Sequence, residues 1–356
     1  MTLTRGVELT LVLSILVLHS RHRLATFECR RNSTIFALSD VFSTFFNLGQ
    51  WSPVTVIPTA SGRPAPISGA RGSFWRDFRE VVTDLWHFRE LLAQLTRRDI
   101  KIRYKQAVMG FAWALFMPVL VVAAGLIIRW AISTVGGTPL NRTGAGELLV
   151  KGLCWSFFVG AIGFATPSLS GNTSLVTKVY FPREVLPLGT LGAQLFDSGI
   201  GAIAVLIATP FMGALFTPAL GWVPLLLLLL IAFTAGACLF LSCANLFFRD
   251  VKYIVQVLLT FGIFFTPVLY DPALLGPTGA KLVMLNPIAP ILEGLRLTIF
   301  HGHSLLDTWA VTNRHGIDVV TWSPWYLAYS VAWAFGGLSV AAVLFHRAEF
   351  AFAEYV

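Results

Sequence analysis

Residues 198–248, SGIGAIAVLIATPFMGALFTPALGWVPLLLLLLIAFTAGACLFLSCANLFF, decide the fold, because these 51 positions contain no Asp, Glu, Lys or Arg. One helical crossing of a lipid bilayer requires about 20 predominantly apolar residues. The run is therefore long enough for the end of one crossing, a turn near Pro210 to Pro224, and a second crossing. This pattern predicts a polytopic membrane protein.

The composition of the whole chain agrees with this prediction. Of the 356 residues, 56% are hydrophobic and 12% are charged, and the mean hydropathy is +0.72, which excludes a water-soluble enzyme. The formal net charge of +8 does not indicate nucleic-acid binding, because the basic residues flank apolar runs, as membrane orientation requires. Three of the four cysteines lie inside apolar runs, so we expect neither a disulfide nor a metal site.

Apolar runs along the chain predict an all-α polytopic membrane protein with six transmembrane helices. The expected crossings are residues 108–130, 150–169, 187–209, 222–246, 253–270 and 322–345. With the amino-terminal side in the cytoplasm, 14 Lys and Arg residues fall in cytoplasmic segments and five in outer segments. The positive-inside rule therefore places both termini, including the tail 349–356, in the cytoplasm.

Two segments precede the first crossing. Residues 1–70 lack a helical period, and we expect a disordered extension or a misassigned start, with a membrane-associated arm as the alternative. Residues 71–105 place apolar side chains every three or four positions, which predicts an amphipathic helix lying in the headgroup plane. A core-facing soluble helix would show the same period. The segment ends in five basic residues, which anionic lipid would attract: Arg97, Arg98, Lys101, Arg103 and Lys105.

The segment between the fifth and sixth crossings, residues 271–318, contains short apolar stretches broken by Asn286-Pro287 and Pro290. These stretches are too brief to span, so they predict re-entrant or surface-lying helices that line or cap a pathway. An ordinary outer loop is the alternative. In the same segment, His301, His303 and Asp307 are more typical of polar surface than of a metal site.

Charged groups inside the crossings are few. Asp197 is the clear case, about ten residues into the third crossing, where an unpaired carboxylate costs about 3 kcal/mol. We expect it to hydrogen-bond to a neighbouring helix, with a direct role in transport as the alternative. The sequence contains no Gly-x4-Gly-Lys-Ser/Thr loop, so this chain is not expected to hydrolyse ATP.

The loop before the third crossing mixes aromatic side chains with both signs of charge. Its residues are Lys178, Tyr180, Phe181, Pro182, Arg183 and Glu184. Aromatic anchors with charges around them are typical of protein interfaces, so this loop is a candidate docking site. A short loop packed on its own bundle would have the same composition.

Four motifs then occur in order. They are RDIKIRYKQ at 98–106 followed by Gly110, Trp113, Ala114 and Pro118; VTKVYFPREVLP at 176–187; FRDV at 248–251 leading to FTPV at 265–268; and LNP at 285–287 with Glu293-Gly294. Together they resemble the permease subunits of ABC-2 type exporters, especially those for polysaccharides or polyol phosphates such as O-antigen, capsule and teichoic acid. The resemblance covers residues 75–348 and does not need the first 70 residues.

The resemblance implies a bacterial inner-membrane subunit that dimerises and binds two copies of a separate ATPase. ATP is bound by that partner, so no cofactor is expected in this chain. It also implies an interfacial helix at 75–95, a coupling helix at 175–184 and periplasmic gate helices at 272–306. The implied substrate is a lipid-linked glycan.

A glycan conduit would use aromatic side chains, because sugar rings present apolar faces that stack on aromatic rings. The candidate lining residues are Trp113, Trp155, Phe157, Phe158, Phe164, Phe264 and Phe265. Three other functions remain open: an ABC-2 permease for a small lipophilic substrate, a membrane-bound glycan-modifying transferase, and a structural membrane anchor. The transferase would need a catalytic constellation at one membrane face, and the seven scattered histidines do not offer one.

Overall fold

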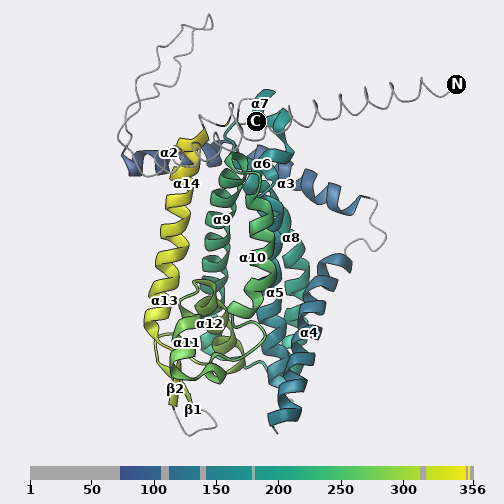
Figure 1. The fold of residues 1–356 in the computed structure, drawn as a ribbon, viewed down its shortest axis with the longest axis vertical. Coiled ribbons are helices and arrows are strands. Elements are labelled where there is room, and N and C mark those ends of the chain that lie inside the picture. The colour runs from purple at the N-terminus through teal and green to yellow at the C-terminus, as the bar shows by residue number, and fades with distance from the viewer. Residues whose placement is uncertain are drawn as a thin grey trace, which may run out of the picture. The chain divides into compact units, whose positions relative to one another are not determined.

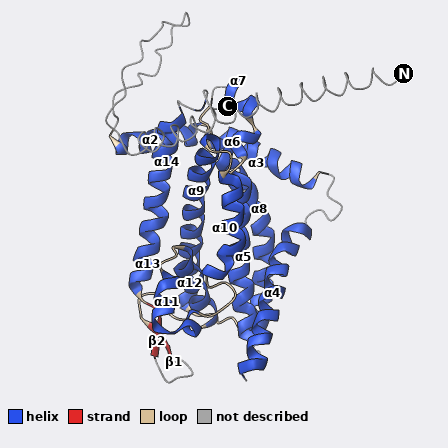
Figure 2. Cartoon of the chain, in the orientation of Figure 1, coloured by secondary structure: helices blue, strands red, loops and turns tan. Residues whose placement is uncertain are grey.

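The computed structural model describes residues 73–105, 112–136, 142–178, 181–312, 318–349 and 352, all within one compact unit, Gly72–Val356. The expectations for residues 1–70 and for most of the tail lie outside these residues. The described part of the chain is mostly helical, as Figure 2 shows, which confirms the helical class predicted from the sequence.

The first half of the unit begins with two helices that precede the bundle. The elements of this half are α2 (Phe74–His87), α3 (Arg89–Tyr104), α4 (Ala112–Gly136), α5 (Arg142–Ala165), α6 (Ser168–Gly171), α7 (Thr173–Lys178) and α8 (Val185–Ala208). The second half contains η1 (Thr209–Met212), η2 (Pro218–Trp222), α9 (Val223–Phe247), α10 (Val251–Phe265), η3 (Pro272–Leu275), α11 (Gly276–Met284), α12 (Ile288–Phe300), β1 (Trp309–Thr312), β2 (Asp318–Trp322), α13 (Pro324–Val331), η4 (Ala332–Gly336) and α14 (Gly337–Ala348).

Four helical segments of the described chain are long and apolar enough to cross a bilayer: Arg142–Ala165, Val185–Met212, Pro218–Phe247 and Pro324–Ala348. They lie at the second, third, fourth and sixth expected crossings. At the first lies α4, with 25 residues. At the fifth lies α10, whose 15 residues span only about 22 Å. It ends at Phe265 because Thr266, which precedes Pro267, is extended.

The run 198–248 contains the turn that the sequence predicts. Helix α8 continues into η1, and the chain then reverses at Gly213, whose φ of 88° is a left-handed conformation that favours glycine. The N–H of Leu215 donates to the carbonyl of Ile299 at 2.8 Å. The turn between α8 and α9 is therefore fixed to the end of α12.

Helices α2 and α3 lie across one end of the bundle, which we call the α2 end (Figure 1). The sequence suggests one amphipathic helix over 71–105, but the helix is interrupted at Phe88. Val81 of α2 is buried, whereas Trp75 and Trp86 are exposed. One face of α2 thus packs on the protein, and Arg347 of α14 holds it there through an ion pair with Asp77 at 2.6 Å.

The opposite end, which we call the α12 end, contains α11, α12 and the β1–β2 hairpin (Figure 1). Helix α11 lies at the surface and exposes Leu282, whereas α12 is buried along nearly its whole length and contacts α5 and α9. The short apolar stretches of residues 271–318 are therefore helices, as expected. That they are re-entrant or lie at the membrane surface stays a prediction; α11 is exposed on the protein and α12 is buried in it.

The hairpin was not predicted from the sequence. Its antiparallel strands pair Trp309 with Trp322 and Thr312 with Asp318. The signal was present, because the second strand, DVVTW, is rich in the β-branched and aromatic residues that favour strands. The fully buried Trp322 donates its indole N–H to the carbonyl of Leu305 at 3.0 Å, which fastens the hairpin to the bundle.

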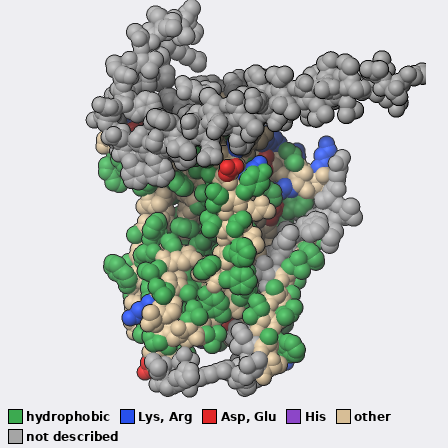
Figure 3. Space-filling model, in the orientation of Figure 1, with side chains coloured by type: hydrophobic (Ala, Val, Ile, Leu, Met, Phe, Trp, Pro, Cys, Tyr) green, Lys and Arg blue, Asp and Glu red, His purple; other side chains and the backbone are tan. Residues whose placement is uncertain are grey.

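Close helix packing sets the core. A Cβ added at Gly236 of α9 would lie 2.9 Å from the Leu338 Cα of α14, so these two backbones approach too closely for a side chain. The buried Cys154, Cys238 and Cys243 are free thiols in this core. The flank of the bundle seen in Figure 3 is largely hydrophobic, and the charged side chains visible there lie near its two ends. Such a surface suits a surrounding membrane.

Candidate functional site

The loop 181–184 at the α2 end leads directly into α8. Phe181 is buried, Pro182 and Arg183 are half-buried, and Glu184 is buried. Tyr180 and the side chain of Lys178 lie outside the described residues. The loop therefore packs against its own bundle, and its buried aromatic ring is part of the core at this end.

Arg183 connects this loop to the chain beyond α14. Its backbone N–H donates to Glu349 Oε1 at 3.2 Å, its guanidinium donates to the Glu349 carbonyl, and Nη2 donates to the Val176 carbonyl at 3.4 Å. The guanidinium also lies 5.7 Å from the centre of the Phe352 ring. One side chain thus joins α7, the loop and the end of the last helix.

Glu184 makes the second connection. Its Oε1 lies 3.3 Å from His346 Nδ1, and Nε2 of the same imidazole lies 3.8 Å from Glu80 Oε2 of α2. Burial, and then repulsion by Glu184, raise the pKa of the Glu349 carboxyl to about 7. Three segments that are far apart in the sequence, namely α2, the loop 181–184 and the end of α14, therefore meet in one group of charged residues at the α2 end. We call Glu80, Arg183, Glu184, His346 and Glu349 the charged joint.

Among the described residues, Glu184, His346 and Glu349 could hold a metal ion, because their ligand atoms lie within 4.8 Å of one another. However, Arg183 already binds Glu349, and His346 already contacts Glu184. The arrangement is that of an ion-paired joint between the loop and the end of α14.

Asp197 lies on α8, where it binds α3. Its two oxygens accept hydrogen bonds from Arg103 Nη1 at 2.5 Å and from the Tyr104 hydroxyl at 2.6 Å. Arg103 also donates to Gln194 at 2.9 Å and lies over the Phe164 ring at 3.8 Å. The partner of Asp197 is thus α3, the helix that precedes the first crossing. Burial raises the pKa of the Tyr104 hydroxyl most, and its hydrogen bond to Asp197 raises it further.

This geometry corrects part of the expectation for the basic cluster. Arg103 is paired with Asp197, and Arg98 binds Asp99 at 3.0 Å and Asn172 at 3.4 Å. These two guanidinium groups neutralise protein carboxylates, so they are not both free to attract lipid. The sequence could not show the contacts with Asp197 and Asn172, because both residues are distant along the chain, whereas Asp99 directly follows Arg98.

The candidate conduit aromatics form two groups. Trp155, Phe157 and Phe158 of α5 are buried in the core, where the Phe158 ring stacks on Phe233 with centroids 6.1 Å apart. The exposed group is Phe164, Phe264 and Phe265. The side chain of Trp113 lies outside the described residues. The structure of one chain therefore does not bring the candidates together on one surface.

The structure adds a buried charge cluster that the sequence analysis missed. Lys151 Nζ of α5 donates to Glu293 Oε2 of α12 at 2.8 Å, and Nε of Arg296 donates to Glu293 Oε1 at 2.8 Å. The exposed fractions of these side chains are 3% for Lys151, 0% for Glu293 and 4% for Arg296. We call these three residues the inner cluster.

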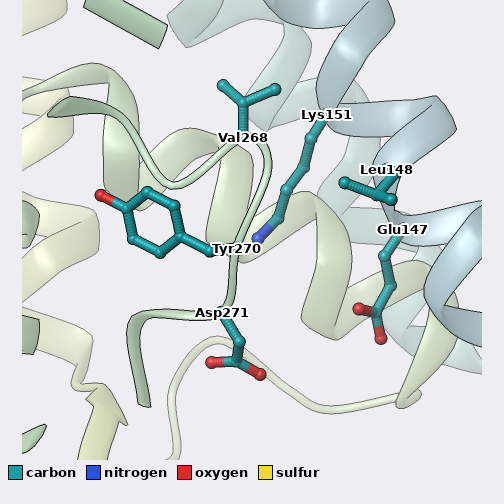
Figure 4. Close-up of a pocket in the computed structure, with 6 residues that line it drawn as sticks. All are labelled: Glu147, Leu148, Lys151, Val268, Tyr270 and Asp271. Carbon is teal, nitrogen blue, oxygen red and sulfur yellow. The ribbon is translucent and has the colours of Figure 1, made fainter. Parts of the chain in front are cut away.

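Three further groups border the inner cluster. Nη1 of Arg296 lies 3.2 Å from His301 Nε2, 3.4 Å from Asp271 Oδ2 and 3.6 Å from Glu147 Oε1. We call Glu147, Asp271 and His301 the rim. Figure 4 shows the adjoining pocket, in which Glu147 and Lys151 extend from α5 and Asp271 from the segment after α10.

This cluster adds to two expectations. Lys151 and Arg296, two of the five basic residues counted in outer segments, are ion-paired in the fold, and His301, expected to be polar surface, is partly exposed beside Glu147. A weak signal was available: Glu147 and Lys151 are four residues apart, and Glu293 and Arg296 three, the spacings that place charges on one helix face.

The sequence of this chain is similar to those of known proteins. The profile of the family described as ABC-2 type transporter matches residues 90–300. A protein of Myxococcus xanthus named O-antigen export system permease protein RfbA is 28% identical over 244 residues, which cover 67% of this chain and 91% of the relative. A protein of the same name from Klebsiella pneumoniae is 27% identical over 224 residues, which cover 62% and 83% of the two chains.

Proposed function

Because the chain belongs to the ABC-2 type transporter family, we propose that it is the permease subunit of an ATP-driven exporter for a lipid-linked polysaccharide, such as O-antigen. The observation that carries the proposal is the similarity to O-antigen export permeases over 244 residues, together with the family match over residues 90–300, which include both the 181–184 loop and α12. The apolar helices of the bundle support a place in the bacterial inner membrane.

We propose six crossings, with the α2 end in the cytoplasm. The cytoplasmic excess of Lys and Arg supports this orientation. The exposed Trp75 and Trp86 of α2 suit the headgroup layer, where indole rings settle at the boundary between water and lipid. In this orientation α11, α12 and the hairpin form the periplasmic side of the permease, with α11 and α12 as its gate helices.

The driving force comes from a separate ATP-binding subunit, of which two copies bind a dimer of the permease. The proposed docking site is the segment 175–184. Arg183 and Glu184 couple this segment to the bundle, because they bind Glu349 and His346 beside the last crossing while α8 begins at Val185. A push on the segment would therefore displace α8 and α14 together.

The conduit is proposed to form between two copies. Helix α10 exposes one apolar, aromatic-rich face, which includes Tyr253, Val257, Phe261, Phe264 and Phe265. Rings on such a face can stack on sugars without one fixed hydrogen-bond register, so a polymer can slide. Phe164, Phe264, Phe265 and Trp113 remain the candidate lining residues, whereas the buried Trp155, Phe157 and Phe158 support the wall behind them.

The test combines purification with transport. The full chain should co-purify with an ATP-binding subunit, and the complex in proteoliposomes should export a lipid-linked glycan when ATP is supplied. Arg183→Glu should lower the glycan exported per ATP hydrolysed, whereas Arg76→Glu, a charge reversal at an exposed site of the same end, should not. A complex that exports equally well with Arg183→Glu would contradict the coupling role, and failure of the wild type to export any glycan would contradict the function.

A further inference from the structure

Helix α12 is an apolar element that contains two oppositely charged residues, Glu293 and Arg296, in its buried length. Removing a charge from water costs several kcal/mol, and well-packed hydrophobic residues often stabilise a fold as well as a buried ion pair does. The stability of the fold alone therefore does not explain why these side chains are charged. Their placement is consistent with a role in which the direction of a contact or an exchange of partners matters.

The guanidinium of Arg296 has two unlike sides. Nε and Nη2 both donate to Glu293, the neighbour on its own helix, and this side is sealed from solvent. Nη1 instead faces three rim groups at 3.2 to 3.6 Å, and Asp271 and His301 have exposed fractions of 28% and 29%. Longer, partly hydrated contacts are weaker than short buried ones. The rim side is thus the side on which partners can be exchanged.

The rim groups belong to different elements. Glu147 lies on α5, Asp271 lies in the segment that follows α10, and His301 directly follows α12. Helix α5 is a rod of 24 residues, about 36 Å long, that runs from the rim to the α2 end. There it continues through α6 and α7 to the loop 181–184. A displacement of α6 and α7 can therefore reach the rim through α5.

We infer that Arg296 is the positioning residue of the periplasmic gate. Its rim contacts with Asp271 and Glu147 hold α12 against α5 and the α10–α11 link, and Arg296 exchanges these partners when the gate opens. The inference rests on the proposed export function. The Glu293–Arg296 pair lies wholly on α12 and remains intact during this exchange, so the charge of Arg296 stays neutralised.

Asp271→Asn is the sharpest variant. Asp271 also caps η3, because its Oδ1 accepts a hydrogen bond from the N–H of Ala273 at 2.9 Å. An asparagine keeps an acceptor for that cap and removes the charge that faces Arg296. The matched control is Asp307→Asn, the same change at an exposed carboxylate of the same end. Both variants are expected to fold as the wild type does.

The experiment uses the full chain with its ATP-binding partner in proteoliposomes, and it measures glycan exported per ATP hydrolysed. We expect Asp271→Asn to lower this ratio about fivefold or more, the lower range of coupling between sites, with an unchanged unfolding temperature. Asp307→Asn should match the wild type. A merely structural contact would change the unfolding temperature and leave the ratio unaltered.

A second measurement reports the rim directly. In a His301→Cys variant, a membrane-impermeant thiol reagent should label the cysteine at a rate that changes when a non-hydrolysable ATP analogue is bound. An equal labelling rate with and without the analogue would overturn the inference, and so would an equal export ratio for Asp271→Asn and Asp307→Asn. In either case, export of glycan by the wild type would still support the proposed function. A wild type that exports no glycan would contradict both the inference and the proposed function.

Discussion

Lys151 Nζ lies 2.8 Å from Glu293 Oε2, although 142 positions separate the two residues in the sequence. The pair joins the only two helices of the described chain that contribute to the inner cluster, α5 and α12, and both side chains are buried. The α12 end is therefore held by an electrostatic contact inside an apolar core, and its strength can be measured.

Lys151→Met tests this contact. Removing one partner of a buried pair leaves the other charge undercompensated, which should lower the free energy of unfolding by about 3 kcal/mol. The measurement is thermal unfolding of the purified full chain in detergent, with Lys281→Met, at an exposed site of α11, as the control. Equal unfolding temperatures for the two variants would show that Glu293 does not depend on Lys151.

Gly236→Ala tests the packing of α9 on α14. The added Cβ would meet backbone atoms of Gly337 and Leu338, which cannot rotate away, so the helices must separate. We expect a loss of stability of about 1–3 kcal/mol. Gly163→Ala on α5 is the matched control, because nothing lies within 4 Å of its added Cβ, and it should be neutral or slightly stabilising. A ranking in which Gly163→Ala is the more damaging would refute the close approach.

Asp197→Asn tests the attachment of α3 to the bundle. The amide still accepts one hydrogen bond but leaves Arg103 without its counter-ion, which should destabilise the attachment by about 1–3 kcal/mol. Limited proteolysis should then cleave more readily within residues 97–111. Asp250→Asn, at an exposed carboxylate whose side chain makes no capping bond, provides the comparison. Identical cleavage rates would show that α3 is held by other contacts.

The charged joint at the α2 end should respond to pH. The pKa of Glu349 rises from its ordinary value of 4.5 to about 7 in the fold. A carboxyl with a raised pKa contributes stability that is present below pH 4.5 and is lost as the pH rises through about 7. Hydrogen exchange of residues 181–186 should therefore be slower at pH 6 than at pH 8, after correction for the intrinsic rate.

Glu349→Gln is the control for this effect, because the amide cannot ionise beside Glu184. The variant should lose most of the difference between the two pH values. A residual difference is assigned to His346, the other titratable group that contacts Glu184. A full difference in Glu349→Gln would assign the response to a group other than Glu349.

Much of the fold could be predicted from the sequence. The helices at the second, third, fourth and sixth crossings follow from runs of apolar residues, and the turn after α8 follows from proline and glycine. These are local properties of the chain. The hairpin 309–322 was missed because its strand signal is short and lies in a segment that proline-broken helices dominate.

The candidate sites were less predictable. The loop 181–184 was recognised from its composition, but whether Phe181 pointed outward or into the bundle depended on the core at the α2 end, to which several helices contribute. Similarly, Asp197 was identified as an intramembrane charge, whereas its partners Arg103 and Tyr104 follow from the angle at which α3 returns to α8.

The sequence by itself determined that this protein is a helical membrane protein and where most of its helices lie, because hydropathy and helix-breaking residues act over a few turns of chain. The tertiary structure decided which charges are buried and paired. Lys151, Glu293 and Arg296 become one cluster only when α5 and α12 pack together, since a salt bridge depends on distance in space and leaves no periodic trace in the sequence.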